Sequence, residues 1–417
     1  MKTYKLTPCI LTGMLLLLMM LSACEYEGPV STWDMLQDRE QIYPEITQVL
    51  PEDAGAASTL IIVGSHFSPV PENDWVYFDQ VRCEIISASE TAIEIYRPDV
   101  VGDSITVSVS VINAATVAKF GPYRLEAVVE GFGNFAGEDN ILAMTVDADE
   151  RLYLAMGTSD MIRLNSDGSR DADFLGTTEY TLWTDMEMGS DGNVYMARSN
   201  NVIFRLSPEG GAAEEFGRLE SRNDRIKTID FDQNDNLFGG GNKSGLVVIH
   251  MDSTFDNRGY YNDWEIISVR VYDGYVYVAA KYKGNDAGVP PLAVYRHPII
   301  DTNGGVGNRE MVLDWTAGPY GLDADLGETE IFDMAISESG VLYIGSDHPD
   351  SPLVMYDMET GEYSTLFFGI IPSPVSQIVW GNGNSLYVII NRATDFSDGG
   401  ALLKINTGEP GATYYGR

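Results

Sequence analysis

The strongest pattern in this 417-residue chain is an apolar–aromatic–apolar motif that returns at regular intervals after residue 131. Its six copies are Leu152-Tyr153-Leu154, Val194-Tyr195-Met196, Leu237-Phe238-Gly239, Val276-Tyr277-Val278, Leu342-Tyr343-Ile344 and Leu386-Tyr387-Val388. The central aromatic residues are 42, 43, 39, 66 and 44 positions apart, and a polar turn precedes each copy. Several short strands repeated at this period are typical of the blades of a β-propeller. The pattern therefore predicts six blades over residues 131–417, with a longer loop between the fourth and the fifth.

The two ends of this region should pair to close the ring. The segment Phe132–Gly137 precedes the first inner strand much as Asp173–Gly176 precedes the second. We therefore expect residues 132–137 to form the outermost strand of the sixth blade, beside Thr413–Gly416. The repeat is similar to NHL-type six-bladed propellers. Two stacked sandwiches, the rival fold, would not explain six matched aromatic residues.

Residues 43–125 form a second β-rich segment. Its strand-like runs are Glu45–Leu50, Thr59–Val63, Trp75–Phe78, Ala92–Tyr96 and Ile105–Val111, separated by Gly, Pro, Asn and Asp, which predicts a small antiparallel sandwich. A strand ending in Gly64-Ser65-His66-Phe67, followed by Val76-Tyr77-Phe78, resembles an IPT/TIG immunoglobulin-like domain, although Ala57 replaces a usual glycine. The fold class is thus all-β. Such domains often act as spacers.

The first 24 residues read as a targeting segment. Lys2 and Lys5 precede an apolar run too short for a membrane span, and Leu21-Ser22-Ala23-Cys24 resembles a bacterial lipobox. The resemblance implies cleavage before Cys24 and attachment of lipid, including palmitate, at this residue. An ordinary signal peptide with an incidental cysteine is the alternative. Residues 25–42 form an acidic tether, and its Glu25 and Glu27 resemble the export tags of surface lipoproteins. The expected location is the cell outer membrane, lipid-anchored and surface-exposed.

The charge and the cysteine content exclude several classes of protein and partner. The chain has 62 Asp and Glu against 26 Lys and Arg, a formal charge of −36, yet 44% of its residues are hydrophobic, which excludes a disordered acidic chain. So acidic a surface repels phosphate backbones and argues against a nucleic-acid partner. Cys9 lies in the leader and Cys24 in the lipobox, so Cys83 remains as a small core residue and no internal disulfide is expected.

One face of the predicted ring carries the candidate ligand site. Loops between second and third strands share this face with loops between blades, and they are long, whereas the opposite turns are tight. The candidate ligand-binding residues in or beside these loops are Trp183, Arg198, Lys243, Trp264, Lys281, Tyr282, Lys283, Trp315, Tyr320 and Arg392. Aromatic rings beside polar groups suit a sugar or a protein partner. Alternatively, the tryptophans are wedges between blades and the cations are simply solvated.

The inner strands place polar residues near the central channel. These candidates are Asp185, Glu187, Asp230, Arg270, Asp333 and Gln377. Several carboxylates around one axis could hold a calcium ion. Arg270 could equally neutralise them. We assign no metal site and expect no other cofactor.

Catalytic motifs are scarce. The four histidines lie in four different segments, and no nucleophile elbow, zinc-protease motif or phosphate loop occurs. Six-bladed lactonases use a channel metal, for which Glu138, Asp185, Asp230 and Asp333 are the only candidate ligands here. A lactonase-like or other sugar-acid hydrolase or lyase is therefore the alternative function. The architecture resembles bacterial surface lipoproteins of glycan capture, which favours a lipid-anchored binding protein for a glycan or a protein partner.

Overall fold

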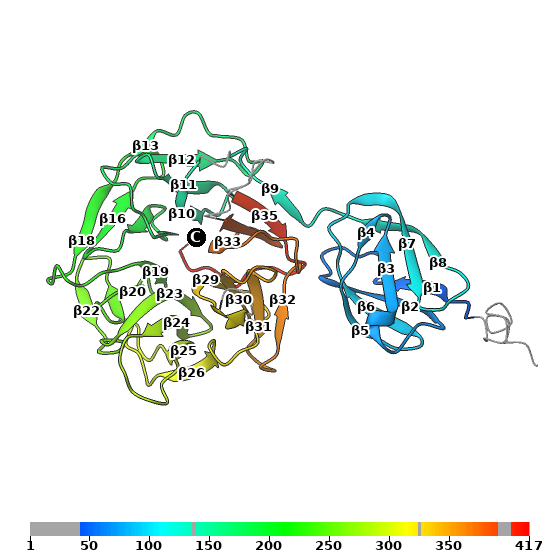
Figure 1. The fold of residues 1–417 in the computed structure, drawn as a ribbon. Coiled ribbons are helices and arrows are strands. Elements are labelled where there is room, and N and C mark those ends of the chain that lie inside the picture. The colour runs from blue at the N-terminus through cyan, green and yellow to red at the C-terminus, as the bar shows by residue number, and fades with distance from the viewer. Residues whose placement is uncertain (1–41, 136–138, 324–326, 391–401, 417) are drawn as a thin grey trace, which may run out of the picture.

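The computed structural model describes residues 42–135, 139–323, 327–390 and 402–416. It shows a ring of small sheets and a smaller β-unit beside it (Figure 1). The predicted all-β fold is confirmed, and the 3-10 turn Pro71–Asn73 is the only helix in the described ranges. No helix within them is long and apolar enough to cross a membrane. The leader with Cys24, the acidic tether up to residue 41, Glu138 and Arg392 lie outside the described residues.

The smaller unit is a sandwich of two antiparallel four-stranded sheets. One sheet has the order β1 (Glu45–Leu50), β2 (Thr59–Ser65), β6 (Ala92–Tyr96), β5 (Ile85–Ala88), and the other has the order β4 (Val81–Arg82), β3 (Asp74–Phe78), β7 (Gly102–Val111), β8 (Ala118–Leu125). Strand β2 shows why this sequence forms a sandwich, because Leu60 and Ile62 are buried in the core while Ile61 between them is exposed. Cys83 lies in the same core.

The ring consists of six sheets in the described part of the chain, one for each predicted blade. From the channel outward the strands are: first blade β10 (Ile141–Val146), β11 (Leu152–Met156), β12 (Asp160–Leu164), β13 (Gly176–Thr177); second blade β14 (Asp185–Met188), β15 (Val194–Ala197), β16 (Val202–Leu206), β18 (Glu214–Arg218); third blade β19 (Thr228–Phe231), β20 (Leu237–Gly240), β21 (Val247–Ile249), β22 (Phe255–Asn257). The fourth blade has β23 (Trp264–Tyr272), β24 (Tyr275–Tyr282), β25 (Leu292–Pro298), β26 (Glu310–Asp314); the fifth has β29 (Ile331–Ile336), β30 (Val341–Ser346), β31 (Leu353–Asp357), β32 (Tyr363–Thr365); and the sixth has β33 (Val375–Trp380), β34 (Ser385–Ile390), β35 (Leu402–Asn406), β9 (Val129–Gly131). Short strand β17 (Gly211–Ala212) joins the edge of the first blade, and β27 (Leu322–Asp323) pairs with β28 (Gly327–Glu328) between the fourth and fifth.

The repeated aromatic residues sit at one equivalent place, the second strand of each blade. All six side chains are buried. Four of the tyrosines also donate a hydrogen bond from the ring hydroxyl to a carboxylate in a turn: Tyr153 to Asp147 at 3.4 Å, Tyr195 to Asp191 at 3.0 Å, Tyr343 to Glu409 at 2.7 Å and Tyr387 to Glu150 at 2.9 Å. A buried ring with a polar tip needs such a partner. The repeated aromatic residues therefore pack between blades and also anchor the turns of the blades.

The ring closes differently from the prediction. Strand β9, Val129–Gly131, pairs antiparallel with Leu403–Ile405 of β35 and completes the sixth blade. Phe132 extends this pairing by donating its N–H to the carbonyl oxygen of Leu402 at 2.9 Å. The chain then turns away, because Gly133 and Asn134 have φ of +80° and +52°, a left-handed conformation that ends an extended strand. The expected pairing with Thr413–Gly416 is therefore wrong for residues 132–135, and residues 136–137 lie outside the described residues. The C-terminal residues run to the centre of the ring (Figure 1).

The sandwich touches the ring at the fifth and sixth blades. The ring of Tyr96 in β6 stacks on Phe368, which follows β32, with centroids 4.3 Å apart and planes inclined by 15°. Arg97 is buried at the base of the sandwich and donates to the carbonyl oxygens of Gly55, Ala57 and Glu126. Since Glu126 begins the connection to β9, this arginine fixes the point at which the chain leaves the sandwich.

Candidate functional site

The ring has two unlike faces. The long-loop face carries the loops between the second and third strands of each blade together with the loops between blades. Its described inter-blade loops run over 132–135 with 139–140, 178–184, 219–227, 258–263, 315–323 with 327–330, and 366–374. The short-turn face carries the turns between first and second strands, of which residues 189–193 and 273–274 are typical. Long loops on a rigid frame are the usual place for a binding site.

The three candidate tryptophans are not available on this face. Trp183, Trp264 and Trp315 are only 3%, 7% and 1% exposed. Trp183 and Trp315 donate their ring N–H to Thr178 Oγ1 and to the carbonyl oxygen of Thr329, each at 3.2 Å. Flat rings fill the wedge between neighbouring sheets well, so the structure selects the packing alternative for all three.

Two candidate tyrosines remain partly accessible. Tyr282 is half-buried, packs against Trp264 with centroids 4.7 Å apart, and donates from its hydroxyl to Asp286 at 2.7 Å. Tyr320 is half-buried in the loop between the fourth and fifth blades and packs edge-on against His348. Tyr282 is the one that adjoins candidate cations, because Lys281 and Lys283 flank it in the chain.

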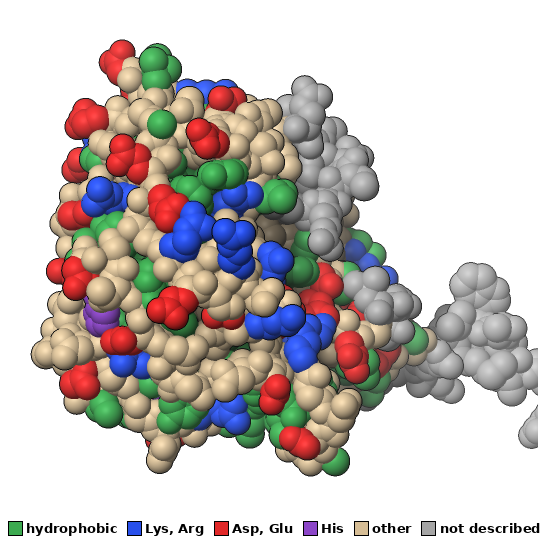
Figure 2. Space-filling view, turned by 90° about the vertical axis from the view of Figure 1, so that its left-hand side faces the viewer, with side chains coloured by type: hydrophobic (Ala, Val, Ile, Leu, Met, Phe, Trp, Pro, Cys, Tyr) green, Lys and Arg blue, Asp and Glu red, His purple; other side chains and the backbone are tan. Residues whose placement is uncertain are grey.

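Six cations of the long-loop face, on the second, third and fourth blades, are here called the basic arc. It consists of Arg198, Arg225, Lys227, Lys243, Lys281 and Lys283. Arg225 donates to the carbonyl oxygen of Ser199 at 3.0 Å and its backbone N–H to that of Asn242 at 3.1 Å, so it joins the loops that carry Arg198 and Lys243. Figure 2 views the ring from the side of these blades and shows Lys and Arg side chains gathered close together.

Half of the arc is neutralised by carboxylates. Lys227 and Lys283 both reach Glu265, at 2.6 Å and 2.8 Å, and Lys281 pairs with Glu330. Burial would raise the pKa of Glu265, but the two lysines outweigh it and hold that pKa at about 2. Arg198, Arg225 and Lys243, in contrast, form no ion pair with any residue that the structure describes.

Sequence reasoning found four of the six arc residues and missed Arg225 and Lys227. Both lie in the connection between the second and third blades, residues 219–227. Their positive charges were a usable signal, but the pairing of Lys227 with Glu265 spans 38 positions and has no signature in the sequence.

The channel residues have structural partners. Each of six side chains accepts a backbone N–H from the next inner strand: Asp185 from Ile229 (2.9 Å), Thr228 from Val269 (3.0 Å), Asp230 from Val271 (2.6 Å), Ser268 from Met334 (3.2 Å), Asp333 from Ile378 (2.9 Å) and Gln377 from Met144 (2.8 Å). These bonds join five of the six pairs of neighbouring blades in the described structure. The channel candidates therefore hold the ring together.

A buried arginine occupies the centre of these carboxylates. Arg270 lies 2.7 Å from Asp333, 3.6 Å from Asp185 and 3.9 Å from Glu187. Burial raises the pKa of Asp185 to about 6 and that of Asp230 to about 7, although Arg270 opposes the shift. No group of three or more His, Cys, Asp or Glu in the described ranges is arranged to hold a metal ion. A guanidinium thus stands where a channel calcium would need to bind.

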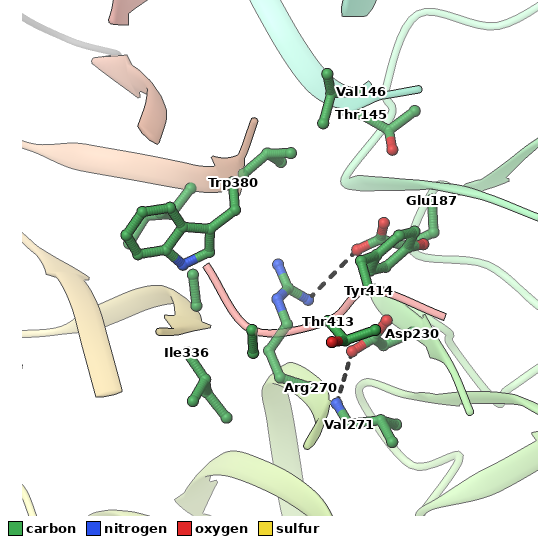
Figure 3. A pocket seen from close by; sticks show the side chains of 14 residues that line it. Thr145, Val146, Glu187, Asp230, Arg270, Val271, Ile336, Trp380, Thr413 and Tyr414 are labelled. Atoms are coloured by element: carbon green, nitrogen blue, oxygen red, sulfur yellow. Dashed lines mark hydrogen bonds and ion pairs between the residues drawn. The ribbon is translucent and has the colours of Figure 1, made fainter. Parts of the chain in front are cut away.

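The chain's own C-terminus fills the channel on the short-turn face. Thr413 and Tyr414 lie beside Arg270, Glu187 and Asp230 (Figure 3). The Tyr414 hydroxyl donates to the carbonyl oxygen of Met188 at 3.1 Å. Upstream, the N–H of Ala412 donates to Ile336 at 3.0 Å. The cavity left beside Arg270 has a volume of about 60 Å³.

Comparison with known proteins agrees with this architecture. Residues 44–123 match the model of the IPT/TIG domain. No curated protein matches the chain. An auxiliary nutrient binding protein from Bacteroides thetaiotaomicron VPI-5482 is similar in structure over 87% of this chain and 97% of its own, with a TM-score of 0.51 and 11% identity.

Two further solved structures are more distant. An auxiliary nutrient binding protein from Bacteroides ovatus ATCC 8483 covers 88% of this chain and 98% of its own, with a TM-score of 0.45 and 13% identity. Virginiamycin B lyase from Staphylococcus aureus covers 62% and 80%, with a TM-score of 0.41 and 14% identity. At these identities the likeness concerns the fold.

Proposed function

We propose that this protein is a lipid-anchored cell-surface binding protein that captures a glycan on the long-loop face of its propeller. The observation that carries the proposal is the contrast between the two possible sites. The channel is filled by Arg270 and the C-terminal tail, whereas the long-loop face presents exposed cations beside a half-buried tyrosine. Binding therefore requires no opening of the ring.

Two further features support a capturing role. The solved structure with a TM-score of 0.51 is named an auxiliary nutrient binding protein, and its likeness in fold extends over 87% of this chain. The IPT/TIG domain would then be the spacer between the ring and a membrane anchor at Cys24. The Glu25 and Glu27 tag would direct the anchored protein to the outer surface of the outer membrane.

The metal-dependent hydrolase or lyase alternative loses support from the same geometry. Asp185, Asp230 and Asp333, three of its candidate ligands, each accept a backbone N–H from the next blade, and Arg270 lies among them. A carboxylate turned toward a metal would give up one of these contacts between blades.

Two measurements test the proposal. A glycan array probed with the mature protein should show saturable binding to at least one glycan without turnover of that glycan. Cys24→Ala should release the protein from membranes or leave an unprocessed precursor. A silent array would reject glycan capture, and a Cys24→Ala protein that fractionates and migrates like the wild type would reject the lipid anchor.

A further inference from the structure

Three members of the basic arc come from neighbouring segments and have no carboxylate partner among the described residues, although the chain has 62 acidic residues against 26 basic ones. Arg198, Arg225 and Lys243 nevertheless form no ion pair with a described residue, and Arg225 and Lys243 are exposed. Glu220 and Asp224 lie on the loop beside Arg225 without pairing with it.

Arg198 is held in a position that suits an anion. Its guanidinium stacks on Tyr180, with 3.8 Å between Cζ and the ring centroid. Its Nε is buried and has no hydrogen-bond partner among the described residues. Burial lowers the pKa of Arg198, and no carboxylate in the described ranges opposes this shift. A planar guanidinium held in one position without a carboxylate partner matches a carboxylate or sulfate group of a ligand.

The backbone ties the three cations into one frame. Ser199, next to Arg198, donates its N–H to the carbonyl oxygen of Ile226 at 2.8 Å. Arg225 pairs as a bridge with Lys243 and donates its side chain to Ser199. The cations thus come from three consecutive segments that are hydrogen-bonded to one another. Apolar surface adjoins them, since Leu182 in the loop of Tyr180 is 65% exposed.

From this arrangement we infer that the glycan of the proposed function is acidic, and that Arg198, Arg225 and Lys243 bind its carboxylate or sulfate groups. The inference rests on the proposed function and adds the ligand's chemical class. A sugar chain fits better than a nucleic acid. The formal charge of −36 repels a long polyanion, while an oligosaccharide with a few anionic groups needs only the local arc. The apolar surface of Tyr180 and Leu182 offers a place for a sugar face.

Calorimetric titration of the mature protein tests the inference. The probes are hexagalacturonate, a chondroitin sulfate hexasaccharide, neutral cellohexaose and hexathymidylate. We expect one or both acidic sugars to bind, with affinity falling roughly tenfold between 50 mM and 300 mM salt because screening weakens the contacts. The two acidic sugars separate carboxylate from sulfate recognition. Cellohexaose and hexathymidylate should not bind measurably.

Variants locate the site. The triple change Arg198→Gln, Arg225→Gln, Lys243→Gln should weaken binding of the acidic sugar about 30-fold or more, since each charged hydrogen bond contributes substantially. The matched control, Arg82→Gln, Lys119→Gln, Arg170→Gln, removes the same charge from exposed residues that form no ion pair in the described structure and lie off the arc. The control should stay within about twofold of the wild type, because screening limits the influence of distant charges.

Several outcomes would overturn the inference. Binding of cellohexaose alone, or equal effects of the two triple variants, would leave glycan capture standing and reject an acidic ligand at the arc. If hexathymidylate binds as tightly as the sugars, the arc binds polyanions in general, and the inference of an acidic glycan fails. If no hexasaccharide binds at 1 mM, the inference fails, and the glycan array decides separately about the proposed function.

Discussion

The two faces of the ring differ in how their charged side chains are paired. At the channel end that opens on the short-turn face, charges are buried and paired: Arg270 lies among carboxylates, and the C-terminal tail covers them. On the long-loop face, Arg198 and Lys243 have no carboxylate partner in the described structure. Buried charges must be compensated within the protein, whereas partly exposed charges are hydrated and remain available to bind a ligand. Charge alone therefore does not mark a binding site, but an unmatched charge held in place does.

The largest expected effect comes from removing the charge at the centre of the channel. Arg270→Met keeps most of the side-chain volume but leaves Asp185, Glu187 and Asp333 without their cation. Breaking a buried charge network in this way typically costs about 3–5 kcal/mol. We expect the free energy of unfolding, measured by urea denaturation, to fall by that amount. Unchanged stability would contradict the structural role of the channel.

Removal of the tail should have the next largest effect. A chain ending at Glu409 loses the hydroxyl contact of Tyr414 with Met188 and uncovers the cavity beside Arg270. We expect a loss of about 2–4 kcal/mol in the free energy of unfolding, from two half-buried tyrosine side chains, Tyr414 and Tyr415, and the hydrogen bonds of the tail. Tyr414→Phe, which removes only the hydroxyl, serves as the milder comparison and should cost about 1 kcal/mol. Affinity for a ligand of the opposite face should not change.

The channel also predicts a pH dependence. The folded pKa values of Asp185 and Asp230, about 6 and about 7, lie above the unfolded value near 4. These carboxyls therefore bind protons more tightly in the folded protein. Their contribution to stability is complete below about pH 4 and is lost as the pH rises through 6 and 7.

We accordingly expect a higher melting temperature at pH 5 than at pH 8. Asp230→Asn should flatten this slope, because an amide can still accept the N–H of Val271 but does not titrate. The matched control is Asp273→Asn on the short-turn face, which should leave the slope unaltered. A melting temperature that rises from pH 5 to pH 8 would contradict the assigned direction of the shifts.

The sequence predicted the ring because blade packing leaves a periodic trace. Aromatic residues such as Tyr153 and Tyr343 recur because the second strand of each blade packs against the next blade. Their spacing along the chain equals the length of a blade. Strand β9 is three residues long and carries no such trace, so the closing strand was misplaced. Loop position likewise did not reveal whether Trp264 faces solvent or a neighbouring sheet.

Ion pairing was beyond sequence reasoning for a related reason. Lys283 meets Glu265 across the hairpin of β23 and β24, and Lys281 meets Glu330 at the start of the next blade. The sequence showed where cations gather but not which of them are already neutralised. That distinction divides the arc into three satisfied and three unsatisfied charges, and it is what points to an acidic ligand.

The smallest expected effect gives the sharpest comparison, because it is a gain. Glu265→Gln removes the one carboxylate that holds Lys227 and Lys283, so two more cations become available to an acidic ligand. We expect affinity for the acidic hexasaccharide that binds the wild type to rise about threefold at low salt. The loss of stability should stay near 1 kcal/mol, since both ion pairs are partly exposed. Glu338→Gln makes the same substitution on the short-turn face and should leave affinity unchanged. If Glu265→Gln weakens binding instead, the lysines must depend on Glu265 for their position, and the boundary between satisfied and unsatisfied charges would have to be redrawn.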